Sequence, residues 1–171
     1  LDALISGFHE ALLALMQLEK PLVTLINGPA AGAGVSLAVV GDVVLAARSA
    51  SFLAAYAGVG LTADGGSSWL LPRLIGLRQA QRMILLNEPV GAEEAAQIGL
   101  ATRVVEDDGL ASEGRKLVRR LAAGSLPAFA GARALLRTSF ETSLEAQLAK
   151  EQTSMIVAAR TPEHAEGLAA F

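Results

Sequence analysis

Apolar residues recur at helical spacing near the start of the chain, and short uncharged runs follow them. The spacing predicts an amphipathic helix from Asp2 to Leu18, and Pro21 prevents this helix from continuing. The run PLVTLIN, residues 21–27, is typical of a short buried strand. The next runs predict a buried helix over 34–40 and strands over 42–47 and 49–54. Strands on both sides of one helix indicate an α/β core.

Helical spacing dominates the chain after the glycine-rich segment in its middle. Gly76 separates two predicted helices, and Glu93 and Glu94 lie in the first turn of a third, where the helix dipole favours negative charge. Pro127 and Pro162 stand where helices are expected to start. The predicted helices cover 69–74, 77–86, 92–98, 109–123, 128–139 and 144–159, and a short strand covers 100–105. An α/β first half is therefore expected to precede a helical second half.

Length and composition fit a single domain with a core of small and aliphatic side chains. The chain has 171 residues, of which 52% are hydrophobic and 18% charged, so a packed core can form. Only 4% are aromatic, so alanine, leucine and valine must fill that core. No cysteine is present, which excludes disulfide bonds and thiolate metal sites.

Charge and hydropathy narrow the range of partners. The formal charge of −3 offers no basic surface for nucleic acid. No apolar run approaches the roughly 20 residues that a membrane-spanning helix needs, and the start of the chain lacks the pattern of a signal peptide. We therefore expect a soluble, cytoplasmic protein that binds neither nucleic acid nor membrane. Since Leu1 begins in the middle of an apolar pattern, we also expect a fragment of a longer protein.

The segment NGPAAGAGVSLAV, residues 27–39, carries small residues in a pattern that several kinds of site use. A Walker A loop needs a lysine, and none occurs between Lys20 and Lys116. The dinucleotide-binding fingerprint needs a glycine where this chain has Leu37. A nucleophilic Ser36 would need a base, but His9 and His164 stand in no recognisable triad context.

Backbone chemistry remains for this segment. A strand that ends near Asn27 and a helix that begins near Ala33 leave several N–H groups unpaired, and such donors suit a carbonyl oxygen that gains negative charge. Gly32, Ala33 and Gly34 carry almost no side chain, so a substrate can approach the backbone closely. Tight packing of a small-residue helix against a sheet explains the same spacing, and the spacing alone leaves both interpretations open.

Three stretches of the chain resemble the enoyl-CoA hydratase/isomerase (crotonase) superfamily. They are KPLVTLINGPAAGAGVSLAVVGDVVLAARSASF, GVGLTADGGSSWLLPRLIGLRQAQRMILLNEPVGAEEAAQIGLATRVV and EHAEGLAAF. The resemblance runs from Glu19 to Phe171, and the combined order of the motifs is highly specific.

The resemblance implies a fold and an assembly. Members have an α/β, crotonase-like core, the ClpP/crotonase spiral of β-β-α turns, followed by helices that form trimers. Residues 1–106 would be the C-terminal portion of the spiral core, and residues 107–171 the helical C-terminal region. A homotrimer or a dimer of trimers is the implied assembly. Relatives carry a further N-terminal segment that supplies the first oxyanion donor, and no counterpart of it is present here.

The resemblance also implies a substrate and a binding site. The substrate would be an acyl-CoA thioester, with coenzyme A as part of it and with no tightly bound cofactor or metal. The middle of the family's glycine triplet, whose N–H polarises the thioester carbonyl, falls on Ala33. Ala31, Gly32 and Gly34 would line the substrate around it. Phe171 resembles a position that approaches the adenine in relatives.

Two positions argue against hydration. Hydratases of the family carry glutamates where this chain has Ser36 and Tyr56. Hydration needs one group that activates water and another that delivers a proton. Serine and a tyrosine with a pKa near 10 are poor replacements at neutral pH, so ordinary enoyl-CoA hydratase activity is not expected.

Asp64 suggests a different reaction. Several isomerases of the superfamily place an acidic residue at this point, and DGGSSWLLPR is similar to the ring-opening phenylacetyl-CoA pathway isomerases. One carboxylate can take a proton from one carbon of an enolisable acyl-CoA and return it to another. Gly65 and Trp69 would border the substrate. Dehalogenase-like members use an aspartate here as a nucleophile, with an aromatic residue eight positions before it, where this chain has Tyr56. A turn or helix-capping aspartate is the simplest alternative.

The sequence therefore predicts an acyl-CoA isomerase of fatty acid metabolism. Its predicted catalytic groups are the Asp64 carboxylate as acid and base, the Ala33 N–H in the oxyanion hole, and Tyr56. A hydratase-like enzyme, a dehalogenase-like lyase or hydrolase, and a noncatalytic CoA-binding subunit remain as alternatives.

Overall fold

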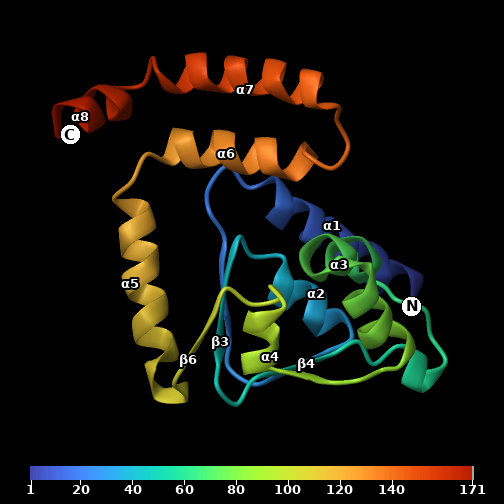
Figure 1. Cartoon of the computed structure of the whole chain (residues 1–171). Coiled ribbons are helices and arrows are strands. Elements are labelled where there is room, and N and C mark those ends of the chain that lie inside the picture. Colours follow the sequence, from blue (N-terminus) through green and yellow to red (C-terminus); the bar gives the residue numbers. More distant parts are fainter. Residues whose placement is uncertain (171) are drawn as a thin grey trace. The chain divides into compact units, whose positions relative to one another are not determined.

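The computed structural model describes residues 1–170 (Figure 1). The strands are β1 (Val23–Ile26), β2 (Pro29–Ala31), β3 (Val43–Ala47), β4 (Ser51–Leu53), β5 (Val90–Gly91) and β6 (Arg103–Val105). The helices are α1 (Asp2–Gln17), α2 (Ala33–Val39), α3 (Ser67–Leu85), α4 (Ala92–Gln97), α5 (Leu110–Ala122), α6 (Leu126–Thr138), α7 (Leu144–Ala158) and α8 (Pro162–Ala170). Short 3-10 turns occur at η1 (Ala57–Val59) and η2 (Asp107–Gly109).

Contacts within the chain group it into two compact units. The first unit contains Leu1–Gln17 and Leu22–Leu117, and the second contains Leu18–Pro21 and the chain from Val118 onward. The predicted functional side chains at positions 31–69 all belong to the first unit. The spiral-core boundary expected after residue 106 stays a prediction.

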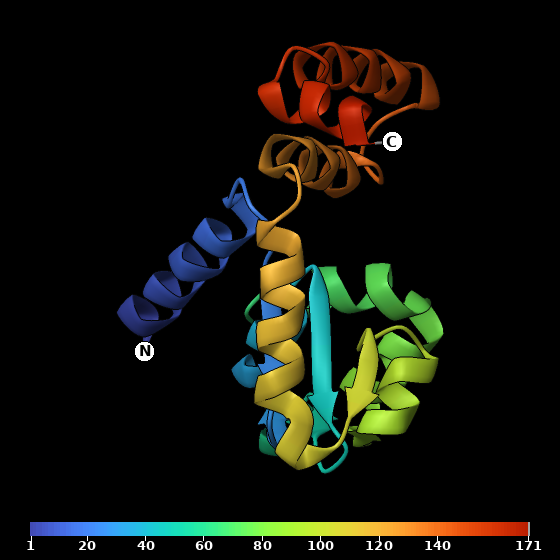
Figure 2. The same ribbon diagram turned by 90° about the vertical axis from the view of Figure 1, so that its left-hand side faces the viewer.

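The first unit is a spiral of strand–strand–helix turns. β1 and β2 are followed by α2, and β3 and β4 are followed by α3. β1 pairs in parallel with β3, and β2 pairs in parallel with β4, so each strand lies beside its counterpart in the next turn. β6 continues the first sheet alongside β3 (Figure 2), and β5 closes the second sheet antiparallel to β4. The α/β β-β-α spiral that the resemblance implies is confirmed.

Small and aliphatic side chains fill the core of this unit, as the composition predicts. Leu45 and Ala46 in the middle of β3 are fully buried, and so is Val35 in α2. Phe52 is the largest fully buried side chain of the described residues. Because β3 has neighbours on both sides, its residues are nearly all apolar, which is typical of a central parallel strand.

Most predicted elements are confirmed, and the differences concern the shortest ones. Gly76 has non-helical backbone angles (φ 74°, ψ 159°) inside α3, so this range contains the two helical pieces that the sequence predicts. β2 was expected to be a turn, and β5 was not expected at all. The Pro29–Ala31 segment becomes a strand because it pairs with β4 in register, Pro29 opposite Ser51. Since β2 is an edge strand, its proline costs no ladder hydrogen bond.

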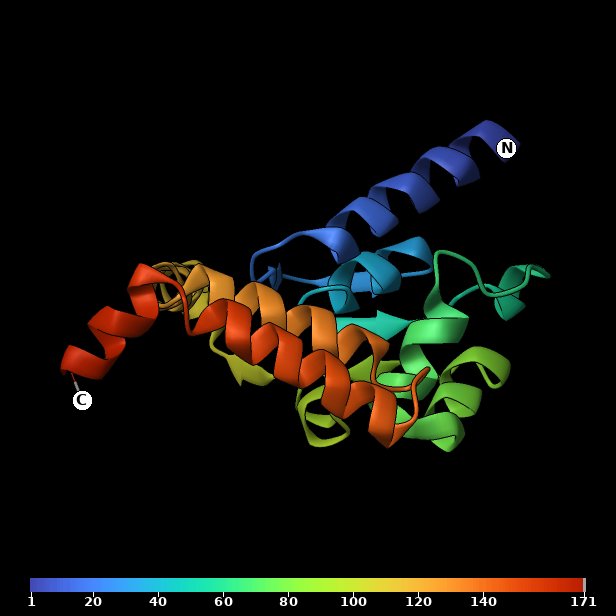
Figure 3. The ribbon, with the colours of Figure 1, turned by 90° about the horizontal axis from the view of Figure 1, so that it is seen from above.

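The second unit is helical. α6 and α7 lie side by side and antiparallel (Figure 3), and α8 follows α7. Ser125 caps α6 by accepting the N–H of Ala128, and Ser143 caps α7 in the same way through Ala146. The trimer expected from this region stays a prediction. No helix within residues 1–170 combines the length and the apolar character that crossing a membrane requires.

Candidate functional site around Asp64

Asp64 lies in the turn that leads into α3. Its backbone carbonyl accepts the N–H of Ser67 at 3.1 Å. The N-cap residue of α3 is Gly66, and no side chain caps this helix. The helix-capping half of the alternative for Asp64 is therefore wrong, whereas the turn half is borne out, since the Asp64 carboxylate accepts the N–H of Gly65. The carboxylate also meets a partner from another element.

That partner is His9 from α1. The distance between His9 Nε2 and Asp64 Oδ1 is 2.7 Å. Hydrogen bonds from the Gly65 N–H and then from His9 lower the pKa of Asp64, so the carboxylate is ionised at neutral pH. An ionised carboxylate only accepts hydrogen bonds, so Nε2 is the ring nitrogen that carries the proton. The two side chains are partly exposed, His9 by 45% and Asp64 by 32%, so small molecules can reach the pair.

Three hydroxyl groups converge on the backbone carbonyl of Asp64. Ser67 Oγ donates to it at 2.8 Å, Tyr56 OH at 3.4 Å and Ser36 Oγ at 3.5 Å. Burial, and next the charge of Asp64, raise the pKa of Tyr56, so this residue is a neutral phenol at pH 7 and a hydrogen-bond donor. Ser36 is fully buried. These hydroxyls fix the backbone that carries the carboxylate.

Gly65 allows α1 and α2 to approach this turn closely. Its φ is +58°, which residues with a side chain rarely adopt. A Cβ at this position would lie 2.5 Å from Phe8 Cε1 and 3.1 Å from Ser36 Oγ. Phe8 and His9, which are adjacent in α1, therefore contact the Asp64–Gly65 turn together. Only glycine fits here without a shift of its neighbours.

α2 begins inside the small-residue segment, and the start of this helix lies close to Tyr56. Gly32 has φ 53° and ψ −123°, and its N–H pairs with the carbonyl of Leu53 at 3.0 Å. A Cβ on Gly32 would lie 3.9 Å from Tyr56 Cζ. The first N–H groups of a helix have no partner inside it, and here they belong to Ala33 and Gly34.

The structure thus brings most of the predicted residues together. Gly32 lies near Tyr56, the Tyr56 hydroxyl donates to the Asp64 carbonyl, and the Asp64 carboxylate pairs with His9. Ala31 is the last residue of β2. The catalytic and substrate-binding roles of all the predicted site residues stay predictions: Asp64, Ala33, Tyr56, Ala31, Gly32, Gly34, Gly65 and Trp69. Phe171 lies outside the described residues.

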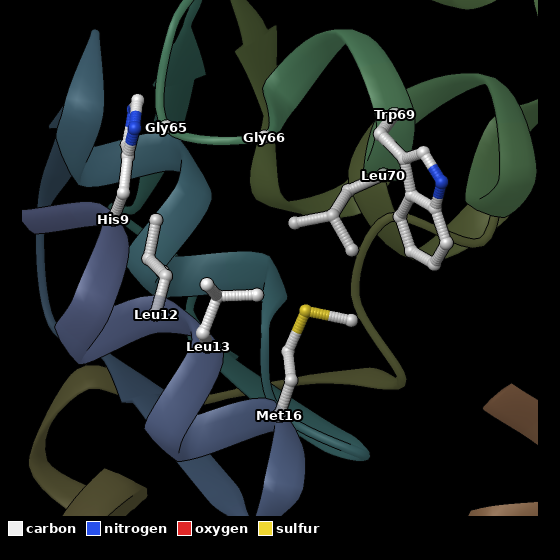
Figure 4. Close-up of a pocket in the computed structure, with 8 residues that line it drawn as sticks. All are labelled: His9, Leu12, Leu13, Met16, Gly65, Gly66, Trp69 and Leu70. Carbon is white, nitrogen blue, oxygen red and sulfur yellow. The ribbon is translucent and has the colours of Figure 1, made fainter. Parts of the chain in front are cut away.

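An apolar cavity borders the His9–Asp64 pair. Its volume is about 390 Å³. Figure 4 shows the side chains of α1 on one side of it, and Trp69 and Leu70 of α3 on the other. Arg73 holds Trp69 in place, because its guanidinium lies 3.9 Å from the centre of the indole ring and donates to the Trp69 carbonyl at 3.1 Å.

A second charged cluster lies elsewhere in the first unit, and we call it the Arg48 cluster: Arg48, Glu93, Glu106 and Asp107. Arg48 donates to Glu106 at 2.7 and 3.0 Å and also to Glu93. Hydrogen bonds from Arg48 and its charge lower the pKa of Glu106. Asp107 Oδ1 accepts the backbone N–H of Ser49 at 3.0 Å. All three side chains that form ion pairs here are more than half exposed.

The sequence alone did not identify His9 as a site residue. His9 and Asp64 are 55 positions apart, and only the packing of α1 against the Asp64 turn brings them together. The only signal was a histidine on an amphipathic helix, which by itself indicates no partner. Across the part of the chain that the structure describes, no group of three or more His, Asp or Glu side chains could hold a metal ion. The expectation of no tightly bound cofactor stays a prediction.

Comparison with known proteins adds a family match. A sequence model of the family described as enoyl-CoA hydratase/isomerase matches residues 2–171. The chain is 38% identical over 157 residues to 1,2-epoxyphenylacetyl-CoA isomerase of Escherichia coli strain K12, covering 92% of this chain and 60% of that protein. It is 37% identical over 172 residues to a probable enoyl-CoA hydratase of Rhodobacter capsulatus, covering 100% of this chain and 67% of that one.

A third relative carries a different reaction in its name. The chain is 31% identical over 164 residues to 4-chlorobenzoyl coenzyme A dehalogenase-1 of an Arthrobacter species, covering 96% of this chain and 59% of that protein. Among solved structures, an enoyl-CoA hydratase from Polaromonas sp. JS666 matches with a TM-score of 0.94 and 32% identity, covering 98% of this chain and 65% of that one. The chain thus spans 59 to 67% of the length of these four proteins.

Proposed function

This chain belongs to the enoyl-CoA hydratase/isomerase family, and we propose that it isomerises an unsaturated acyl-CoA by moving one proton through Asp64. The observation that carries the proposal is the ionised Asp64 carboxylate held by His9 at 2.7 Å. Ser36 and Tyr56, at the two positions where hydratases carry glutamates, instead direct their hydroxyls at the Asp64 backbone. Among these residues, Asp64 thus carries the carboxyl group that is available for proton transfer.

The reaction needs one carboxylate and one oxyanion site. Asp64 takes a proton from the α-carbon, which lies between the double bond and the thioester. The electrons of the broken C–H bond then move onto the thioester oxygen, and an enolate forms. The protonated Asp64 then gives the proton to the other end of the conjugated system, which shifts the double bond. Atoms and charge balance, since the proton that leaves one carbon arrives at another.

A carboxylate with a lowered pKa is a weak base, so the enolate must be stabilised strongly. Backbone N–H donors aimed at the developing oxyanion supply such stabilisation. The Ala33 N–H at the start of α2 is the donor that this chain offers. His9 acts as a positioning residue, because its hydrogen bond to Oδ1 fixes the orientation of the Asp64 carboxylate.

A second candidate uses Asp64 as a nucleophile. The chain's resemblance to the dehalogenase supports it, and so does one feature of the site: a histidine beside an ionised carboxylate could accept a proton from water. Asp64 would displace a leaving group from an aryl carbon, and water would then hydrolyse the ester. Release of chloride from 4-chlorobenzoyl-CoA, with oxygen from labelled water found in Asp64, would favour this candidate over isomerisation.

The direct test is isomerisation of a 3-enoyl-CoA to the conjugated 2-enoyl-CoA by the full-length protein. We expect turnover in the unsubstituted protein and a loss of at least about 100-fold in Asp64→Asn, since a positioned acid–base group contributes roughly that much or more. Asp108→Asn, an exposed aspartate in η2, is the matched control and should keep full activity.

Two results would contradict the proposal. Efficient hydration of crotonyl-CoA that Asp64→Asn leaves undiminished would show a hydratase that does not use Asp64. Binding of enoyl-, dienoyl- and aryl-CoA thioesters without turnover of any of them would favour a noncatalytic CoA-binding subunit.

A further inference from the structure

The apolar cavity beside Asp64 has the size and lining of a binding site. Its volume of about 390 Å³ lies within the usual range for small-molecule sites, roughly 300 to 1,000 Å³. Leu12, Leu13 and Met16 line it from α1, and Trp69 and Leu70 line it from α3. His9 is the one titratable group among its lining residues. The cavity therefore suits an uncharged apolar group.

Two lining residues of the cavity, His9 and Gly65, are also neighbours of Asp64. His9, which lines it, holds Asp64 at 2.7 Å, and Gly65, the residue after Asp64, also lines it (Figure 4). The part of the substrate that occupies the cavity would thus lie close to the carbon that exchanges its proton with Asp64. This position corresponds to the acyl part of a thioester, since coenzyme A itself is highly charged and hydrophilic.

We infer that the cavity selects acyl-CoA thioesters whose acyl group is an uncharged apolar ring or medium-length chain, and that Met16 and Leu13 limit its size. The inference rests on the proposed function for the identity of the substrate as an acyl-CoA. An acetyl group would leave the cavity empty, whereas a ring or a chain of about eight carbons would exchange its water for contact with leucine, methionine and tryptophan. No lysine or arginine is among the lining residues, so a terminal carboxylate would lose its hydration without a permanently charged partner and should bind poorly.

Binding to the full-length protein tests the inference without any need for turnover. The probes are acetyl-CoA, phenylacetyl-CoA, octanoyl-CoA and suberyl-CoA, which has the length of octanoyl-CoA but ends in a carboxylate. Calorimetry at pH 8 should show that phenylacetyl-CoA or octanoyl-CoA binds about 10- to 100-fold more tightly than acetyl-CoA, the gain expected from burying one large apolar group. Suberyl-CoA should bind no more tightly than acetyl-CoA. The stronger of the two apolar probes identifies a ring or a chain as the preferred group.

Filling the cavity should remove this preference. Met16→Trp should lower the ratio of apolar-probe to acetyl-CoA affinity by about tenfold. Leu13→Trp, at a residue that is 56% exposed and tolerant of a larger side chain, should act in the same direction if Met16→Trp fails to fold. Leu4→Trp is the matched control, because Leu4 lies on the same helix, is 74% exposed and does not line the cavity.

The outcomes separate this inference from the proposed function. Equal affinity for all four probes, tight binding of suberyl-CoA, or an equal effect of Leu4→Trp and the two cavity variants would overturn the inference. Selective binding of apolar acyl groups by a protein that isomerises none of them would support the inference and contradict the proposed function.

Discussion

The His9–Asp64 pair and the Arg48 cluster both hold carboxylates whose pKa is lowered by hydrogen bonds, but their surroundings differ. Asp64 faces one histidine, His9, which together with Gly65 lines an apolar cavity. In the Arg48 cluster, one guanidinium serves two glutamates, and the ion-paired side chains are more than half exposed. A lowered carboxyl pKa therefore does not identify a functional site by itself. The neighbouring cavity and the small number of fixed partners distinguish Asp64.

The two regions should differ most in how far a glycine-to-alanine substitution, which adds one methyl group, destabilises the protein. Gly65→Ala should destabilise the protein by about 2–5 kcal/mol, because a positive φ costs roughly 1–2 kcal/mol for a residue with a side chain and overpacking adds about 1–3. Its Cβ would lie 2.5 Å from Phe8 Cε1. Gly109→Ala, next to the Arg48 cluster, meets no atom within 4 Å and should change stability far less. Denaturant unfolding of both variants makes the comparison, and equal destabilisation would show that the Asp64 turn is not packed as described.

An intermediate effect is expected at His9. The His9 hydrogen bond is the second-largest cause of the lowered pKa of Asp64, so His9→Ala should raise that pKa. The acid limb of the isomerisation pH profile should then move to higher pH, because the base must be ionised to take a proton. The stability that Asp64 contributes is present above its unfolded pKa near 3.9 and is lost as the pH falls through its lower folded pKa. In His9→Ala the folded pKa of Asp64 should lie closer to its unfolded value, so the pH range between the two should become narrower.

His9→Gln and His164→Ala provide the controls for that profile. Glutamine retains an N–H donor, so His9→Gln should keep part of the lowering of the Asp64 pKa and bring the acid limb back toward lower pH. A purely structural role for His9 would not predict this difference between the two variants. His164 lies in α8, and its replacement should leave the profile unchanged. A pH profile that is identical in His9→Ala and the unsubstituted protein would remove His9 from the account.

The smallest effect is expected in the Arg48 cluster. Arg48→Ala should leave isomerisation unchanged and alter the unfolding midpoint only slightly, because exposed ion pairs contribute little to stability. The pKa of Glu106 should rise toward its ordinary value in this variant, which titration by NMR can follow. The small stability contributed by Glu106 is present above its unfolded pKa and is lost as the pH falls, so any change should appear only in acid. A large loss of isomerisation activity in Arg48→Ala would mean that the two regions are functionally connected.

Local sequence explains much of the fold, but the site depended on contacts between distant segments. α1, β1 and β3 were predictable because their hydrophobic spacing and flanking residues act within a few positions. β2 and β5 were not, since two- and three-residue strands exist only through pairing with β4. Asp64 could be singled out by its resemblance to isomerases of the family. His9 could not, because no local pattern shows which helix packs against the Asp64 turn.

The structure explains why a small residue, Ser36, stands at position 36, which the sequence alone did not explain. The fully buried side chain lies against Gly65, whose Cβ position is 3.1 Å from Ser36 Oγ. A glutamate at position 36 would need the space that the Asp64–Gly65 turn occupies. The small residue at position 36 and the Asp64–Gly65 turn are therefore parts of one packed arrangement.

The most direct test of the central claim is exchange of the acyl α-proton in deuterated water, measured side by side for Asp64→Asn and Glu106→Gln in the full-length protein. The assay detects enolisation whichever acyl group is the natural one, so phenylacetyl-CoA and octanoyl-CoA can both serve as probes. We predict that Asp64→Asn exchanges at least about 100-fold more slowly than the unsubstituted protein, whereas Glu106→Gln exchanges at the same rate. Exchange that persists undiminished in Asp64→Asn would contradict the account.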